Sequence, residues 1–275
     1  MTVRARDWAE LCAPISAPAW EAVAEATAIG DGTRVLDLGC GTGEFCALAA
    51  GRGATACGID ASQDMLDFAA QATPAADLRR GELDELPWPD DTFDVVTAFN
   101  SLQFAGDQLT AQREARRVAR PGGLVAVCNW RGPEHSELLR VTRALRAAPA
   151  TSRPAGDESS GATTGQARPA GDESRGAATG PPPPAALGEP GVLEDLARAA
   201  GLVPVADGEV AVVFEVPDLD TLERALVATG VAGPAIERLG RDAVRTTMAG
   251  AAEPFRRPDG AYRFDNVFRY VVSRA

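Results

Sequence analysis

Residues 35–43 read Val35-Leu36-Asp37-Leu38-Gly39-Cys40-Gly41-Thr42-Gly43. This pattern predicts a short buried strand over residues 34–38 that runs into a glycine-rich turn and then into a helix. Because glycine has no Cβ, such a turn lets a ligand approach the main chain closely. The spacing Gly-x-Gly-x-Gly differs from the Gly-x-Gly-x-x-Gly of dinucleotide-binding proteins. Many sheets need a glycine turn for other reasons, so its meaning depends on the segments that follow it.

Strands and helices are predicted to alternate after this turn. The predicted helices cover residues 44–51, 62–68 and 107–119, and the predicted strands cover residues 34–38, 54–59, the surroundings of Leu78, 93–99 and 124–130. Such alternation predicts an α/β protein with a doubly wound, parallel sheet. Ligands of such sheets bind at the carboxyl ends of the strands, where the glycine turn is expected to lie.

Composition and pattern divide the chain into four segments. Residues 1–33 are expected to be helical, with prolines breaking the run, and residues 34–150 to form the ligand-binding core. Residues 151–186 are rich in Pro, Gly, Ala, Ser and Thr and contain Arg-Pro-Ala-Gly-Asp-Glu-Ser twice, so we expect a flexible low-complexity insertion. Residues 187–275 are expected to complete the sheet, with strands over 209–216 and 262–273 and helices over 189–200, 218–229 and 234–249.

Composition also argues against several classes of function. A formal net charge of −12 disfavours nucleic acid as a partner. No apolar run reaches the length of about 18 residues that a membrane span needs. The chain contains no lysine, which excludes a Schiff-base lysine and a Walker phosphate loop. One histidine and five scattered cysteines predict neither a metal site nor a disulfide framework. Residues 1–10 lack an apolar signal core, so we expect a cytoplasmic protein.

Two carboxylates follow the glycine turn at the ends of later strands. Asp60 ends the second predicted strand, where it can accept hydrogen bonds from both ribose hydroxyls of an adenosine, or can merely cap the next helix. Glu82 lies in the loop after the third strand. There it can accept a hydrogen bond from an adenine amino group, or it can be a solvated loop residue.

The order of these segments resembles the class I S-adenosylmethionine (SAM) dependent methyltransferases. It is most similar to the small-molecule group of the ubiquinone and menaquinone biosynthesis methyltransferases. The matching segments are residues 35–43, Gly58-Ile59-Asp60-Ala61-Ser62, Gly81-Glu82-Leu83-Asp84-Glu85-Leu86-Pro87, Phe93-Asp94-Val95-Val96 and Arg120-Pro121-Gly122-Gly123. The resemblance implies SAM as cofactor. It also implies a Rossmann-like, doubly wound sheet of seven strands, mostly parallel with the last strand antiparallel, with helical N-terminal and C-terminal lid elements.

The resemblance assigns roles to residues along the strand ends. The cofactor-binding residues that it implies are Asp37, Gly39, Gly41, Gly43, Asp60, Ala61, Glu82, Leu83 and Asn100. The glycines would line the methionine and ribose portion, with Asp37 ordering the turn. Asp60 would hold the ribose, and Glu82 with Leu83 would contact adenine, although aspartate is more usual at position 82. Asn100 would lie near the methionine amino group.

The acceptor site is expected at the same edge of the sheet. By resemblance, Ser101 and Gln103 would face the transferred methyl group, while Trp130 and Arg131 end the fifth strand, where they can shape the site or serve packing and surface charge. A hydroxyl acceptor needs a base, and His135 is the catalytic candidate because it is the only histidine. Its surroundings favour an exposed helix start over that role.

Three functions remain open from the sequence. The favoured one is a methyltransferase, monomeric or homodimeric, that methylates oxygen, nitrogen or carbon of a small-molecule acceptor, for example in secondary metabolism. The second is a SAM-binding protein of this fold without methyl transfer, such as a cyclase. The third is a non-enzymatic binding protein that uses residues 151–186. The acceptor, the atom methylated and the oligomeric state do not follow from the sequence.

Overall fold

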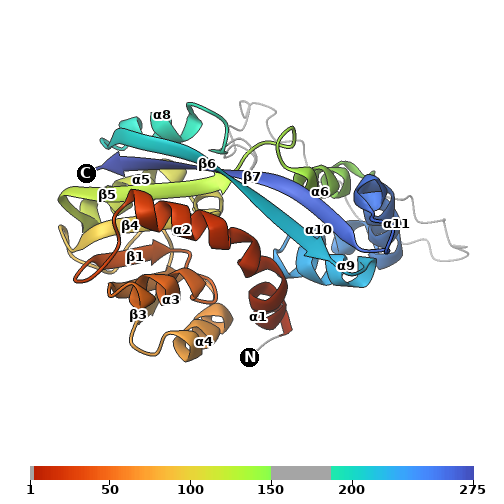
Figure 1. Cartoon of the computed structure of the whole chain (residues 1–275), viewed down its shortest axis with the longest axis horizontal. Helices are drawn as coiled ribbons and strands as arrows, with labels where there is room; N and C mark the ends of the chain where they lie inside the picture. Colours follow the sequence, from red (N-terminus) through yellow and green to blue (C-terminus); the bar gives the residue numbers. More distant parts are fainter. Residues whose placement is uncertain (1–2, 150–186) are drawn as a thin grey trace, which may run out of the picture.

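The structure, a computed structural model, describes residues 3–149 and 187–275. A seven-stranded sheet in the order β3-β2-β1-β4-β5-β7-β6 runs through it (Figure 1). Neighbouring strands from β3 to β5 are parallel, and β7 is antiparallel to both β5 and β6. The strands are β1 (Arg34–Leu38), β2 (Thr55–Asp60), β3 (Asp77–Arg80), β4 (Phe93–Phe99), β5 (Ala119–Trp130), β6 (Val203–Val216) and β7 (Tyr262–Arg274). The predicted doubly wound sheet with an antiparallel last strand is confirmed.

Helices cover both faces of the parallel part of the sheet. Successive side chains of a strand point to opposite faces, so Val35 and Leu36 enter different apolar clusters. The Leu36 cluster includes α5 (Gln108–Val118) and α8 (Val192–Ala199). The Val35 cluster includes residues of α2 (Ala17–Ala26), α3 (Glu44–Gly51) and α4 (Gln63–Ala72). This two-sided burial explains why the central strands are continuous apolar runs.

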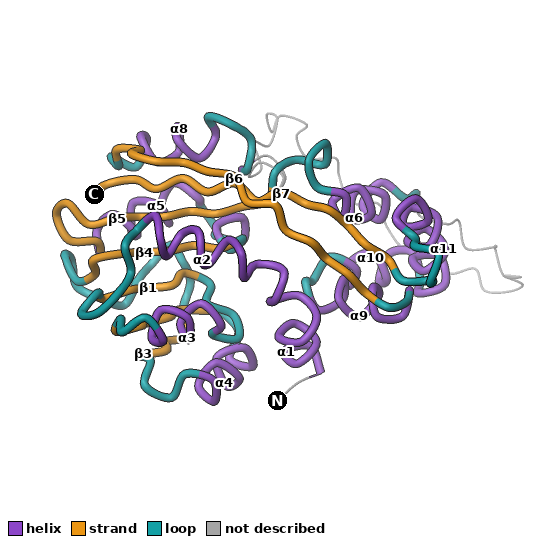
Figure 2. The backbone as a smooth tube through the Cα atoms, viewed as in Figure 1, coloured by secondary structure: helices purple, strands orange, loops and turns teal. Residues whose placement is uncertain are grey.

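A second group of helices gathers around the far ends of β6 and β7 (Figure 2). These helices are α1 (Val3–Asp7), α6 (Glu137–Ala147), α9 (Leu219–Ala228), α10 (Ala232–Leu239) and α11 (Arg241–Ala252). Helices α6, α9, α10 and α11 share a separate core in which Leu222, Val244 and Met248 are fully buried, and α1 contacts α9 and α4. The helical end therefore has packing of its own, and it lies beyond the carboxyl ends of the parallel strands.

Several boundaries differ from the sequence prediction. The helix predicted over residues 234–249 is wrong, because the chain forms two helices that are separated at Gly240, where φ is 82°. Strand β6 begins at Val203 rather than near residue 209, because it pairs with β7 along its whole length. Helix α6 begins at Glu137, where the surroundings of His135 favoured a helix start, but its extent was not predicted. The break expected near Pro14 is present as a π-helical turn (Trp8–Cys12) and a 3-10 turn (Ala13–Ser16).

Three further expectations concern the insertion, membrane-spanning segments and the cysteines. The insertion predicted over residues 151–186 lies outside the described residues. Within them, no helix combines the length and the apolar character that crossing a bilayer requires. All five cysteines are free and buried.

Candidate functional site

The glycine turn lies at the carboxyl end of β1, between β2 and β4. Gly39, Gly41 and Gly43 all have positive φ angles, of 71°, 54° and 88°. A Cβ at Gly39 would lie 2.4 Å from Ser101 Cβ, and one at Gly43 would lie 2.8 Å from Ala69 Cβ. The turn therefore needs glycine at these two positions for lack of space as well as for backbone conformation.

Asp60 ties the end of β2 to this turn. The Gly41 amide donates to Asp60 Oδ2 at 3.0 Å, and the Ser62 amide donates to Asp60 Oδ1 at 2.8 Å. A carboxylate has about four acceptor positions, so these two bonds leave capacity for hydroxyl donors of a ligand. The two alternatives for Asp60 are compatible, because it binds the start of α4 and also lines a cavity.

Asp37 is buried beneath the turn. It is 4% exposed, and Thr97 Oγ1 donates to its Oδ1 at 2.8 Å. Burial raises the pKa of Asp37 to about 7; the Thr97 hydrogen bond opposes the shift, and the charges of Asp60 and Glu44 add to it. Burial likewise raises the pKa of Glu44. Asp37 thus holds the strand end from below and does not line the cavity.

Because its pKa is raised, Asp37 is predicted to lower the free energy of unfolding as the pH rises. Below about pH 4 the carboxyl group is protonated in both the folded and the unfolded chain. Between about pH 4 and about pH 7 only the unfolded chain ionises, so the free energy of unfolding falls; above about pH 7 the loss is constant. We expect Asp37→Asn, which cannot ionise, to gain up to about 4 kcal/mol relative to the wild type from pH 4 to pH 8. Urea unfolding of the two proteins without ligand at both pH values measures this gain, and a difference that is independent of pH would contradict it.

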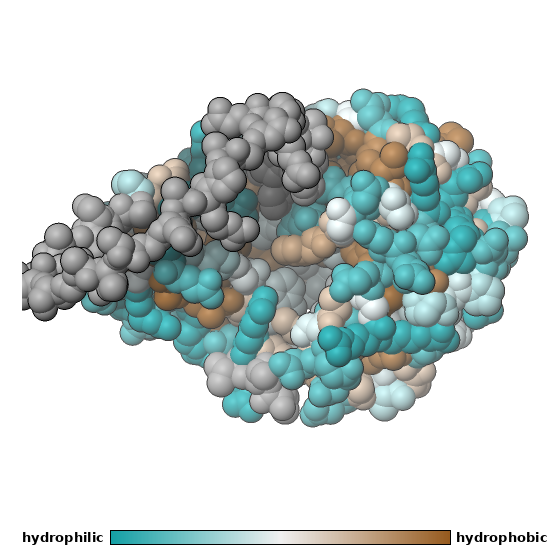
Figure 3. All heavy atoms as spheres, turned by 180° about the vertical axis from the view of Figure 1, so that it is seen from behind, coloured by the Kyte–Doolittle hydropathy of each residue, from teal (hydrophilic) through white to brown (hydrophobic). Residues whose placement is uncertain are grey.

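A cavity of about 890 Å³ extends from the glycine turn to the helical end. Ten of the residues predicted for the site line it: Gly39, Gly41, Asp60, Ala61, Glu82, Leu83, Asn100, Ser101, Gln103 and Trp130. Pockets for small ligands occupy roughly 300–1,000 Å³, so this cavity is at the large end of that range. Seen from behind, apolar side chains are visible among hydrophilic ones in the middle of the face (Figure 3).

Two amide oxygens in the cavity wall have no partner. Asn100 Oδ1 and Gln103 Oε1 are buried, and no donor in the described residues reaches them. Buried polar atoms in folded proteins are almost always hydrogen-bonded, so these oxygens indicate donors supplied by a ligand or by water. Ser101 differs from them, because its hydroxyl donates to the Leu38 carbonyl at 2.5 Å and so braces the strand end.

The structure does not bring four predicted residues to the cavity wall. Asp37 and Gly43 lie behind the turn. Arg131 is buried and forms an ion pair with Glu209 of β6. His135 is exposed, and its amide donates to the Gly132 carbonyl in the turn before α6. Of the residues at the end of β5, Trp130 lines the cavity, with its ring edge-on to Phe268 at 4.5 Å.

The sequence did not indicate the helical wall of the cavity in detail. It implied C-terminal lid elements, and Phe214 and Leu226 of the C-terminal part line the cavity. Further lining residues were missed: Arg4, Trp8, Cys12, Ile15, Leu138, Leu139, Thr142, Arg146, Ala225, Val231, Pro234, Ala235 and Arg238. Trp8 Nε1 would lie 3.3 Å from a Cβ at Gly41, so the N-terminal segment reaches the glycine turn. The amphipathic character of these helices was a signal, but it does not tell which neighbour they face.

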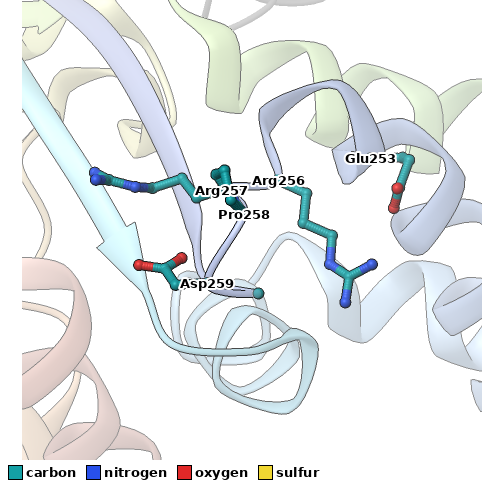
Figure 4. Close-up of a pocket in the computed structure, with 6 residues that line it drawn as sticks. Glu253, Arg256, Arg257, Pro258 and Asp259 are labelled. Carbon is teal, nitrogen blue, oxygen red and sulfur yellow. The ribbon is translucent and has the colours of Figure 1, made fainter.

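A second hollow, of about 520 Å³, lies at the surface turn before β7. Its side chains carry charges of both signs and come from one short stretch of chain, Glu253 to Gly260 (Figure 4). Arg257 is already paired with Glu215. Because it shares no lining residue with the cavity at the carboxyl ends of the parallel strands, this hollow is not part of the candidate site. Across residues 3–149 and 187–275, no cluster of His, Cys, Asp and Glu is placed to hold a metal ion.

Residues 36–127 match the methyltransferase domain family. This match confirms the resemblance inferred from the glycine turn and the segments after it. The uncharacterized protein Rv1405c of Mycobacterium tuberculosis is 34% identical over 128 residues, 45% of this chain and 47% of the relative. A demethylmenaquinone methyltransferase of Bacillus licheniformis is 40% identical over 109 residues, 38% of this chain and 47% of that enzyme. The chain thus spans about half the length of the curated relatives that it matches.

Solved structures agree on the fold. The YcgJ protein of Bacillus subtilis superposes with a TM-score of 0.57 and 17% sequence identity, over 93% of this chain and 97% of YcgJ. At this identity the likeness concerns the fold alone. It extends over 93% of this chain, whereas the family match covers residues 36–127.

Proposed function

We propose that this protein is a SAM-dependent methyltransferase that acts on a small, largely apolar acceptor. The observation that carries the proposal is a single cavity that joins the glycine turn and Asp60 at the sheet edge to an apolar helical wall. The match of residues 36–127 to methyltransferase domains and the similarity to demethylmenaquinone methyltransferases support it.

The sheet edge fits the parts of SAM. The glycine turn leaves room for close approach to the main chain, and Asp60 keeps acceptor capacity for ribose hydroxyls. The unpartnered Asn100 Oδ1 suits the donor that a methionine ammonium group supplies. Glu82 is exposed and Leu83 is buried at the end where adenine would lie. We assign Gly39, Gly41, Asp60, Glu82 and Asn100 to cofactor binding on these grounds.

The chain would contribute mainly by positioning. SAM supplies a methyl group that its positive sulfur already activates. Apolar residues of α6 and α9 exclude water around the transferred group, and Gln103 Oε1 is available to accept a hydrogen bond from the acceptor. Burial raises the pKa of the Cys12 thiol to about 12, so Cys12 is not a base near neutral pH. With His135 exposed, we infer an acceptor that needs no histidine base.

The direct test is thermal and chemical denaturation with ligands. At ~100 times its dissociation constant, SAM or its demethylated product S-adenosylhomocysteine should stabilise the protein by about 2.7 kcal/mol. NAD at the same concentration should give no shift. If neither sulfur compound stabilises the folded state, the proposal is wrong.

A second measurement separates methyl transfer from mere SAM binding. Incubation with methyl-labelled SAM and a panel of apolar acceptors should give labelled product. Conversion of an acceptor without label would favour a cyclase-like activity instead. A variant without residues 151–186 should keep SAM binding if the cavity is the functional site, whereas a non-enzymatic binding protein that uses this segment should lose its partner.

A further inference from the structure

The helical end of the cavity carries positive charge. Arg4 of α1, Arg146 in the last turn of α6 and Arg238 of α10 all line it. Among the lining residues of the described chain, the carboxylates are Asp60 and Glu82, and both lie at the sheet edge. The cavity therefore has an acidic end beside the glycine turn and a basic end among the helices.

These three arginines are not neutralised by carboxylates of the described residues. Arg4 Nε donates to the Ala228 carbonyl at 3.2 Å, and Arg238 donates to the Leu145 and Ala148 carbonyls at 2.9 and 2.5 Å. Main-chain carbonyls satisfy hydrogen bonds but carry no net charge. The side chain of Arg146 has no partner among the residues described.

Other arginines of the same helical group are paired. Arg224 forms an ion pair with Asp7, and Arg241 and Arg245 both pair with the buried Glu223. In a chain with a formal net charge of −12, carboxylates are abundant. At the helical end, the arginines that form no ion pair with a carboxylate of the described residues either line the cavity or face solvent. Positive charge at the cavity wall is therefore available to a ligand.

The arginines are arranged around one apolar surface. Arg4 contacts the end of α9, and Arg238 contacts the end of α6 beside Arg146. The wall between these ends and the sheet edge is apolar, and its residues are Trp8, Ile15, Leu138, Phe214, Leu226 and Pro234. A molecule that fills this part of the cavity meets apolar side chains along its length, with Arg146 and Arg238 together at the end of α6 and Arg4 at the end of α9.

We propose that the acceptor is an anionic amphiphile, with an apolar body against α6 and α9 and an acidic head group at Arg4, Arg146 and Arg238. This inference rests on the proposed function and adds the class of acceptor to it. The charges also set its orientation. The carboxylates of Asp60 and Glu82 repel the acidic head, so the opposite end of the molecule points to the glycine turn, where the methyl group would be transferred. A cationic acceptor is disfavoured at both the arginines and the sulfonium.

A matched pair of fluorescent probes tests the charge preference. The probes are 8-anilinonaphthalene-1-sulfonate and N-phenyl-1-naphthylamine, which have the same ring system with and without the sulfonate. We expect the wild-type protein to bind the anionic probe about tenfold more tightly than the neutral one, and this preference to shrink as salt is raised. Arg4→Gln/Arg146→Gln should lose most of the preference for the sulfonate while it keeps its affinity for the neutral probe. Arg238 is left unchanged because it also holds the end of α6.

Arg143→Gln is the matched control, because Arg143 is exposed on the same helix and does not line the cavity. It should keep the full preference for the sulfonate. Equal affinity of the wild type for both probes, or the same loss in Arg143→Gln as in the double variant, would overturn the inference. A second variant, Ala235→Trp, fills the cavity and should lower the affinity for both probes. Unchanged affinities would show that the probes bind elsewhere, which would also overturn the inference.

SAM-induced stabilisation of the same variants distinguishes a failure of the anionic-acceptor inference from a failure of the proposed methyltransferase function. The double variant should retain the wild-type response to SAM, since Arg4 donates to the Ala228 carbonyl, Arg146 lies in the last turn of α6, and neither side chain is bonded to the glycine turn or to Asp60 in the described residues. This response also shows that the variant is folded. If SAM binds and the sulfonate is not preferred, only the anionic acceptor is wrong. If SAM does not bind the wild type, the proposed function itself fails.

Discussion

Asp60→Asn is expected to lower the affinity for SAM about a hundredfold. The substitution keeps the size of the side chain but removes the charge, and it replaces one acceptor oxygen with a donor group. Two hydrogen bonds from ribose hydroxyls to a carboxylate would be lost or weakened, which costs about 2.7 kcal/mol at typical values for bonds to charged groups. Isothermal titration calorimetry with SAM and with S-adenosylhomocysteine measures the change.

Asp64→Asn provides the control for this substitution. Asp64 is exposed in the first turn of α4, four positions from Asp60, and it does not line the cavity. It removes the same charge from the same region, so any effect of net charge on SAM binding appears in both variants. An affinity of Asp60→Asn within about threefold of that of the control would contradict the assignment of Asp60 to the ribose.

Gly39→Ala is expected to destabilise the protein by about 3–4 kcal/mol. Two costs combine here, a side chain in the left-handed region of φ and a Cβ placed 2.4 Å from Ser101 Cβ. Relief of this overlap would displace Ser101, whose hydroxyl donates to the Leu38 carbonyl. Urea denaturation gives the free energy, and SAM titration shows whether the displaced turn still binds.

Gly32→Ala separates these two costs. Gly32 has a similar φ of 76°, but no atom lies within 4 Å of the position of its Cβ. It should lose only about 1–2 kcal/mol. Gly39→Ala combined with Ser101→Gly should recover the steric part of the loss and keep the conformational part. Equal destabilisation by Gly39→Ala and Gly32→Ala would show that the contact with Ser101 does not constrain the turn.

The sequence was sufficient for the parallel half of the fold. Strands such as β4, over Phe93–Phe99, are buried on both faces, so their apolar character is continuous and their ends are marked by turns. The error at Gly240 has a different origin. Glycine is tolerated in an amphipathic helical pattern, so the pattern did not reveal the break at Gly240 between α10 and α11, which both pack into the helical core.

For the candidate site, too, the sequence was more informative on the parallel side of the sheet than on the antiparallel side. The half proposed for the cofactor could be predicted because Gly39 and Asn100 directly follow a strand and Asp60 ends one, and parallel strands bring their carboxyl ends to one edge. Arg131 follows β5 in the same way, yet it pairs with Glu209 because the sheet continues through β7 to β6. On the antiparallel side of the sheet, a position next to a strand end was therefore not enough to predict that a residue lines the site.

By itself, then, the sequence determined the doubly wound core and the residues at its carboxyl edge, because local periodicity and turn chemistry specify both. The tertiary structure alone decided the half of the cavity that we propose for the acceptor. Its residues come from α1, α6 and the α9–α10 pair, three parts of the chain that are far apart in sequence. Helices α6, α9 and α10 meet when their apolar faces are buried in one core, and α1 contacts α9. Hydrophobic burial is not directional, so the pattern of a helix tells that one face is covered but not which partner covers it. The basic end at Arg4, Arg146 and Arg238 became visible only once these helices were in place.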